Sequence, residues 1–151
     1  MNAPLRHPQP ADPGFAARCR ASFARQKAMA LIGARMASIE PGRCEIELDW
    51  RADLTQQKGF LHGGIVGMIA DTACGYAAYS LMPARSSLVT VEYKINMLAP
   101  GRGERFVARA EVLKAGRSLT VTRGEVLADG TLCAVMQQTL MMLPDTPDTP
   151  E

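Results

Sequence analysis

The chain has 151 residues, enough for one domain with its own hydrophobic core. The formal net charge of +2 is too small to indicate a nucleic-acid-binding protein, and 47% hydrophobic with 21% charged residues is ordinary for a globular chain. The four cysteines are widely spaced and form no C-x-x-C pair. We therefore expect reduced thiols, no metal site and a cytoplasmic location.

The two ends of the chain differ in composition from the part between them. Residues 1–12 are rich in proline and have no apolar core, so they indicate a flexible lead-in, neither a secretory signal nor a membrane anchor. Residues 144–151 contain no apolar residue other than proline and are net negative, so we expect a disordered tail. A single domain over residues 13–143 remains.

The first half of this domain contains signals for one helix and two strands. Asp12-Pro13 is typical of a helix start, with Asp12 as the cap, and apolar residues then recur every four positions, which predicts an amphipathic helix over about residues 13–28. A strand is expected between Gly33 and the Pro41-Gly42 turn. Strict alternation of apolar and acidic residues then predicts a half-buried strand from Cys44 to Trp50.

The second half consists of alternating segments separated by glycine turns, which predicts an antiparallel sheet. The expected strands cover about residues 87–98, 104–114, 117–128 and 131–143, with a two-residue hairpin at Asp129-Gly130. In the first of these strands, alternation predicts one face with Val89, Val91, Tyr93, Ile95 and Met97, and the other with Thr90, Glu92, Lys94 and Asn96.

Between the two halves lies the longest apolar run, Gly59 to Ser80, which contains one carboxylate, Asp71. We expect a helix from His62 to about Leu81. Its length is close to that of a transmembrane helix, but Asp71 at the bilayer centre would cost about 2.5 to 3.5 kcal/mol, and Gly and Ala replace the residues that drive insertion. A buried helix enclosed by the sheet, in an α+β domain, is the better interpretation.

The motif H-G-G-x6-D, from His62 to Asp71, together with this order of elements resembles the hotdog-fold acyl-CoA thioesterases of the phenylacetate-pathway type. The resemblance covers about residues 30–143. It implies a long central helix wrapped by an antiparallel sheet of five to six strands, with the N-terminal helix added here. It also implies hydrolysis of acyl-CoA to free acid and CoA without a cofactor, at active sites shared between two chains, often in a tetramer of two such dimers.

Gly63 and Asp71 are eight residues apart, which is about 12 Å along a helix axis. No single thioester carbonyl can touch both. If the Gly63 N–H stabilises the oxyanion and Asp71 acts as general base or nucleophile, the two groups come from different subunits. The spacing therefore predicts an obligate dimer. The structural alternatives are an Asp71 bonded to Thr72 or Ser80 and a Gly63 needed only for sterics at the helix start.

Other residues of the motif and its neighbours are further candidates. Gly64, like Gly63, has no side chain, so a ligand can approach the backbone closely at the helix start. His62 either caps the helix or takes part in the chemistry. Gln56 stands fifteen residues before Asp71, where family members have an Asn, and could donate an amide N–H. Thr90 matches a Ser or Thr that helps hold the attacking water; the alternative is a threonine chosen for its strand propensity.

The late turn Gly116-Arg117-Ser118 corresponds in this family to a turn near the pantetheine arm or the phosphates of coenzyme A, and Arg117 would supply a charge-assisted contact. Two other functions stay open. One is a non-catalytic acyl-CoA or acyl-carrier sensor, which the Gln56 departure favours. The other is a hotdog dehydratase, which needs a His and an acid facing one substrate.

Overall fold

The structure is a computed structural model that describes residues 9–148. Residues 1–8 and 149–151, which belong to the predicted lead-in and tail, lie outside the described range. The elements in chain order are α1 (Phe15–Ala24), α2 (Lys27–Ile32), β1 (Arg35–Glu40), β2 (Arg43–Asp49), a 3-10 turn (Ala52–Leu54), α3 (Gly63–Tyr79), β3 (Ser87–Met97), β4 (Arg105–Ala115), β5 (Leu119–Ala128) and β6 (Thr131–Leu143).

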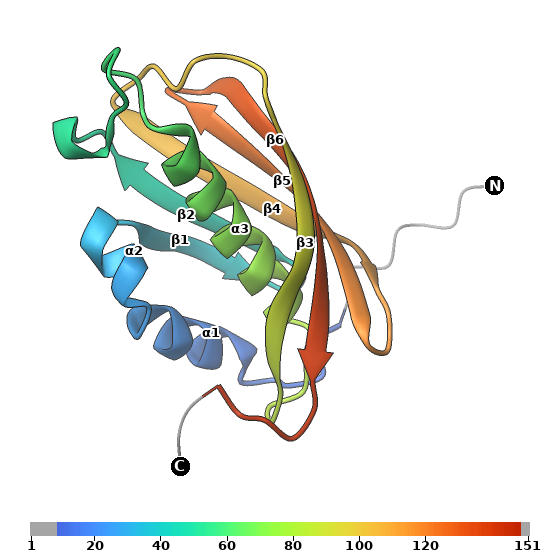
Figure 1. The fold of residues 1–151 in the computed structure, drawn as a ribbon. Coiled ribbons are helices and arrows are strands. Elements are labelled where there is room, and N and C mark those ends of the chain that lie inside the picture. The colour runs from blue at the N-terminus through green and yellow to red at the C-terminus, as the bar shows by residue number, and fades with distance from the viewer. Residues whose placement is uncertain (1–8, 149–151) are drawn as a thin grey trace.

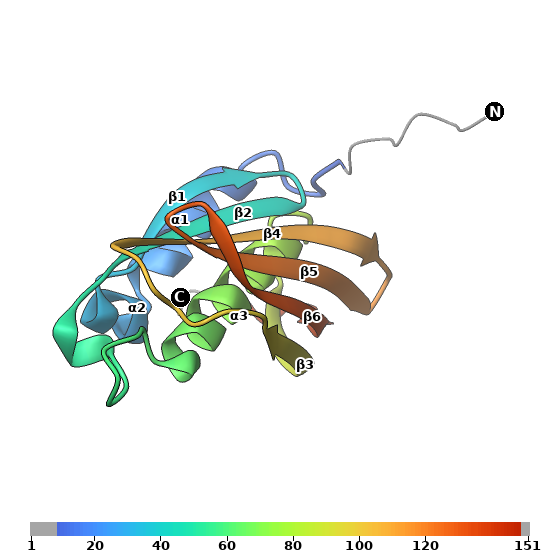
Figure 2. The ribbon, with the colours of Figure 1, turned by 90° about the horizontal axis from the view of Figure 1, so that it is seen from above.

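The six strands form one antiparallel sheet in the order β1-β2-β4-β5-β6-β3, and the sheet curves around α3 (Figure 1). Seen from above, the strands form an arc over the helix, while α1 and α2 lie beside β1 (Figure 2). The Asp129-Gly130 turn joins β5 and β6, with both residues at positive φ, as the hairpin prediction requires. The predicted α+β hotdog architecture, with an antiparallel sheet of five to six strands, is confirmed, and the sheet has six.

The central position of α3 follows from its composition. Eleven of its seventeen residues are buried, and most are small or apolar, so the sheet can approach the helix on several sides. The approach is close at Gly124 of β5, where an added Cβ would lie 2.9 Å from the Cys74 Sγ of α3. Among residues 9–148, no helix is long and apolar enough to cross a membrane.

The N-terminal helix differs from the single helix expected over residues 13–28. It breaks at Gln26, whose backbone is extended, and α2 continues in a new direction that buries Met29 and Ile32. Asp12 does not cap α1 directly, because Gly14 is the capping residue. The Asp12 carboxylate instead accepts hydrogen bonds from the Gly14 N–H at 2.8 Å and from the Arg18 Nε at 2.8 Å.

The expected division of β3 into two faces is wrong, because a bulge interrupts the alternation. Thr90 and Glu92 pair with consecutive residues of β6, which leaves Val91 as the extra residue. Beyond the bulge, Tyr93 pairs with the buried Gln138. Thr90 therefore shares the α3-facing side of the sheet with Tyr93, and not the outer side with Glu92.

Candidate active site

Asp71 lies in the middle of α3, where the helix passes β3 and β6. Its Oδ1 accepts a hydrogen bond from the Thr90 Oγ1 at 3.0 Å and another from the Gln138 Nε2 at 2.5 Å. The Gln138 Nε2 also lies 2.8 Å from the Thr90 Oγ1. Three side chains from three elements thus form a closed triangle. Within residues 9–148, the Asp71 Oδ2 has no hydrogen-bond partner.

The alternative expectation is that Asp71 bonds to Thr72 or Ser80. It is wrong, because Asp71 bonds to Thr90 and Gln138. The Ser80 hydroxyl donates to the Ala77 carbonyl at 2.7 Å and accepts from the Gly42 N–H at 2.8 Å. It ties the end of α3 to the turn between β1 and β2, and Asp71 bonds elsewhere.

A cavity of about 230 Å³ opens beside Asp71, between α3, the start of β3 and the first helix. Its lining includes a stripe along α3 at helical spacing, so the cavity extends from Asp71 towards the C-terminal end of the helix. The lining residues are Ser22, Gln26, Asp71, Thr72, Gly75, Tyr76, Tyr79, Leu88, Thr90 and Asp148.

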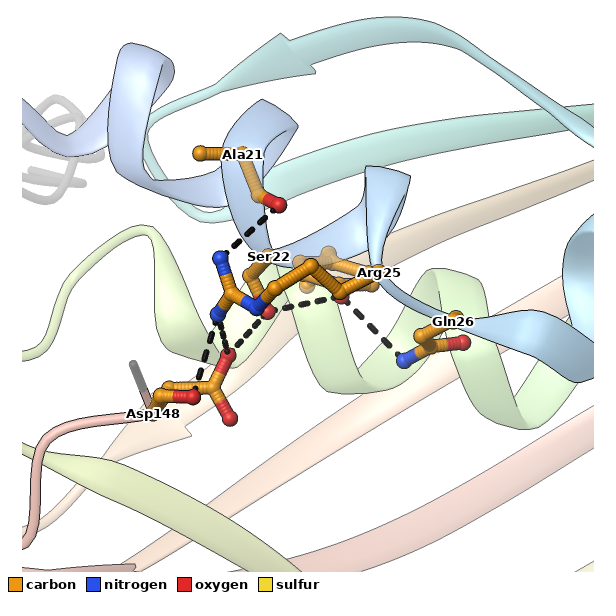
Figure 3. Close-up of polar contacts among 6 residues, drawn as sticks. Ala21, Ser22, Arg25, Gln26 and Asp148 are labelled. Carbon is orange, nitrogen blue, oxygen red and sulfur yellow. Dashed lines mark hydrogen bonds and ion pairs between the residues drawn. The ribbon is translucent and has the colours of Figure 1, made fainter. Parts of the chain in front are cut away.

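Part of the cavity lining belongs to a polar cluster that joins the first helix, α3 and the segment after β6 (Figure 3). The Tyr76 hydroxyl lies 2.9 Å from the Ser22 Oγ and accepts from the Gln26 Nε2 at 3.2 Å. The carboxylate of Asp148, in the segment after β6, accepts hydrogen bonds from Ser22 and from the Arg25 guanidinium. Burial raises the pKa of Tyr76 to about 12, so its hydroxyl is neutral at physiological pH.

Gly63 is the first residue of α3 and faces a different hollow, of about 330 Å³. No acceptor within the described chain takes its N–H, which lies at the positive end of the helix. Gln56 lines the same hollow; its Oε1 accepts from the Lys58 N–H, which leaves the Nε2 free to donate. The structure thus brings Gln56 and Gly63 together.

His62 caps α3. Its Nδ1 accepts the Gly64 N–H at 2.9 Å, and its carbonyl accepts from the Ile65 and Val66 N–H groups. This is the capping alternative of the sequence analysis, and it uses the Gly64 N–H within the chain. A direct part for His62 in the chemistry stays a prediction.

The Gly116-Arg117-Ser118 turn joins β4 and β5 and lines neither of these two hollows. The Gly116 N–H donates to the Leu119 carbonyl at 2.8 Å, and an added Cβ at Gly116 would lie 2.7 Å from that oxygen, so this tight turn requires glycine. The Arg117 side chain is exposed. Its contact with coenzyme A stays a prediction.

The predicted site residues therefore form two groups, with Asp71 and Thr90 at one place and Gln56, His62, Gly63 and Gly64 at the other. This agrees with the 12 Å spacing expected along α3. Sequence reasoning missed Gln138. The pattern that could have identified it is the position of this amide between Met136 and Leu140 on the inward face of β6, where alternation predicts an apolar residue. Among residues 9–148, no three His, Cys, Asp or Glu side chains gather as a metal site would need.

Residues 58–134 match the Thioesterase superfamily. The chain belongs to this family. It is therefore a thioester hydrolase, and the matched segment includes Gly63, Asp71 and Thr90 but ends before Gln138.

Known relatives agree with this assignment. A thioesterase family protein from Silicibacter pomeroyi is 50% identical, with a TM-score of 0.84 over 87% of this chain and 99% of that one. The Escherichia coli medium/long-chain acyl-CoA thioesterase YigI is 30% identical over 82 residues, 46% of this chain and 53% of YigI, so the match spans about half of that relative. The Escherichia coli PaaI protein of the phenylacetic acid degradation operon shares the fold, with 20% identity and a TM-score of 0.79 over 88% of this chain and 99% of that one.

Proposed function

We propose that the protein hydrolyses acyl-CoA thioesters to the free acid and CoA, with Asp71 as the general base or nucleophile. One observation carries the proposal. The Asp71 carboxylate has one oxygen held by two neutral donors and the other unbonded, beside a cavity large enough for a small acyl group. Membership of the thioesterase superfamily supports the reaction. Similarity to YigI, a medium/long-chain acyl-CoA thioesterase, supports a CoA ester as the substrate.

As a general base, the Asp71 Oδ2 takes a proton from a water molecule that attacks the thioester carbonyl. The tetrahedral intermediate carries a negative oxygen, which the Gly63 N–H of a partner subunit stabilises. Collapse of the intermediate breaks the carbon–sulfur bond, and the thiolate of CoA leaves and takes up a proton. As a nucleophile, the same oxygen attacks the carbonyl directly, and water then hydrolyses the anhydride that forms. In either route, Thr90 stands beside the reacting water.

The partner subunit is supported by the edge of the sheet. β3 is an edge strand of eleven residues without proline, and Val91 and Tyr93 on it are half exposed. A long edge strand with exposed apolar side chains favours pairing with another strand. Asp71 lies near Thr90, towards one end of β3, and Gly63 lies near Met97 at the other.

A two-fold axis near the middle of β3 would pair two copies of the strand in antiparallel orientation. The Thr90 end of one copy would then face the Met97 end of the other. This arrangement would bring Asp71 of one subunit to the Gly63 of its partner and form two equivalent sites. We propose this dimer as the active form, with a tetramer of two such dimers as its larger assembly.

The remaining candidate residues take supporting parts in this proposal. Gln56, on the Gly63 side, donates its free amide N–H to the thioester carbonyl, and His62 holds the start of α3 in place. The turn of Gly116, Arg117 and Ser118 contacts the pantetheine arm or phosphates of CoA, with Arg117 supplying the charge. A cytoplasmic location fits a CoA ester as the substrate.

The test is steady-state hydrolysis of a panel of aliphatic and aromatic acyl-CoAs by the wild type and by Asp71→Asn. We expect turnover by the wild type and a loss of at least about a hundredfold in kcat for Asp71→Asn. Asp53→Asn changes an exposed carboxylate that pairs with Arg51 and lines neither hollow; it is the matched control and should keep full activity. Full activity of Asp71→Asn would contradict the mechanism. Binding of acyl-CoA without turnover would favour the sensor function.

A further inference from the structure

We propose that Gln138 is a positioning residue for Asp71, holding the Oδ1 of the carboxylate so that the Oδ2 is presented to the reacting water or thioester. The inference rests on the proposed role of Asp71 and adds to it a residue that lies outside the segment matching the thioesterase superfamily.

The hydrogens of the triangle have one arrangement only. The Gln138 amide nitrogen carries two hydrogens, one directed to the Asp71 Oδ1 at 2.5 Å and one to the Thr90 Oγ1 at 2.8 Å. The Thr90 hydroxyl hydrogen is then directed to the same Asp71 Oδ1 at 3.0 Å. A reversed amide would place the Gln138 Oε1 against a carboxylate oxygen, which is repulsive. The charge of Asp71 therefore fixes the orientation of Gln138.

Packing alone does not account for a glutamine at this position. The Gln138 side chain is 1% exposed, and its Oε1 is buried without a hydrogen-bond partner among residues 9–148. A buried acceptor without a partner is destabilising. Its neighbours on the same face of β6, Met136 and Leu140, are apolar, so an apolar side chain would fill the position without this cost. The contacts with Asp71 and Thr90 are what the amide provides.

Gln138 also makes the carboxylate rigid. A carboxylate at the end of a helical Asp rotates easily about its last torsion, because that torsion has broad minima. β6 lies between β5 and β3 in the sheet, so the amide that it carries is held firmly. Two donors on the Oδ1, one from each of two neighbouring strands, fix the plane of the carboxylate and leave one defined oxygen for the reaction. Such preorganisation lowers the barrier when the reacting atoms must meet at about 3 to 3.5 Å.

The test is a double-mutant cycle between Gln138→Met and Asp71→Asn, measured with an acyl-CoA that the wild type turns over. Methionine has a similar length and no hydrogen-bond donor. We expect Gln138→Met to lower kcat about tenfold to a hundredfold, with KM changed less than about twofold and a melting temperature equal to or above that of the wild type. In the Asp71→Asn background, Gln138→Met should change kcat by less than about twofold, because the group that it positions is gone.

The matched control is Thr122→Val. Thr122 is buried on β5, directly opposite Gln138 in the register; its hydroxyl donates to the Gln138 backbone carbonyl at 3.4 Å and has no hydrogen bond to the Gln138 amide or to Asp71. It should keep wild-type kcat, which separates positioning from general disturbance of this layer of the core. If Gln138→Met does not fold, Gln138→Leu provides the same comparison.

The outcomes separate this inference from the proposed function. A Gln138→Met enzyme with wild-type kcat, alongside an inactive Asp71→Asn, would overturn the positioning role and leave the proposed function intact. Equal losses from Gln138→Met in both backgrounds would show a structural role and overturn the inference as well. If Asp71→Asn keeps full activity, the proposed function fails and the inference fails with it.

Discussion

Replacing Gly63 with proline removes the proposed oxyanion donor while leaving the helix start intact. Gly63 is the first residue of α3, a position where proline is favoured because its missing N–H and fixed φ suit the first turn. The preceding residue, His62, has φ −60° and ψ 135°, which is the conformation that a residue before proline prefers. Within residues 9–148 the Gly63 N–H has no acceptor, so Gly63→Pro breaks no hydrogen bond of the chain.

The expected effects on catalysis and on stability have opposite signs. Loss of one oxyanion donor raises the barrier by about 3 kcal/mol, which lowers kcat by about a hundredfold to a thousandfold. Folding should be unaffected or improved by about 0.4 to 1 kcal/mol, because proline restricts the unfolded chain. Gly63→Ala is the matched control. Its Cβ would lie 3.5 Å from the Met97 Cε, an ordinary contact, and it keeps the N–H.

The assay is acyl-CoA hydrolysis together with thermal unfolding of the wild type, Gly63→Pro and Gly63→Ala at equal dimer concentration. We expect Gly63→Ala to keep kcat within about threefold and Gly63→Pro to lose it without a fall in melting temperature. If Gly63→Pro keeps most of its kcat, the N–H is not the donor. If both variants lose activity equally, glycine is needed at this position for space.

Three further predictions concern other parts of the molecule. Thr90→Val removes one of the two donors to Asp71 and should lower kcat about tenfold with little change in KM, as measured by steady-state kinetics. Val91→Lys places a charge on the half-exposed edge of β3 and should yield an inactive monomer by light scattering; an active monomer would contradict the shared site. The Arg18 guanidinium and the Gly14 N–H hold the pKa of Asp12 below its ordinary value of 3.8, so this carboxylate stabilises the fold above that pH and ceases to do so as pH falls through the lowered pKa. Asp12→Asn should therefore lose about 1 kcal/mol of unfolding free energy at pH 7 and much less at pH 2 in urea titrations, and an equal loss at both pH values would refute the assignment.

The strands were predictable because their signals are local. Alternation with period two and glycine turns place the four late strands within about two residues of their observed bounds. The Asp129-Gly130 hairpin needs two residues at positive φ, and both occupy that region, at 45° and 82°. The separation of Gly63 from Asp71 was equally accessible, since a helix fixes the rise per residue.

The bulge in β3 and the break at Gln26 were not predictable, because each depends on partners far away in the sequence. A bulge is defined by the register with β6, and alternation within β3 alone continues unbroken through Val91. The break before α2 accompanies the burial of Met29 and Ile32 against residues that are distant in the sequence. Gln138 was not predicted for the same reason, because its role depends on its contact with Asp71, a residue distant in the sequence.

α3 contains no Lys or Arg, so Asp71 has no oppositely charged partner on its own helix. An arginine partner would stabilise the carboxylate through two parallel hydrogen bonds and would occupy both oxygens. The neutral donors Thr90 and Gln138 instead bind only the Oδ1. They compensate part of the cost of burial and leave the Oδ2 free. A carboxylate that must act as base or nucleophile needs this kind of support, because a salt bridge would stabilise it at the expense of its reactivity.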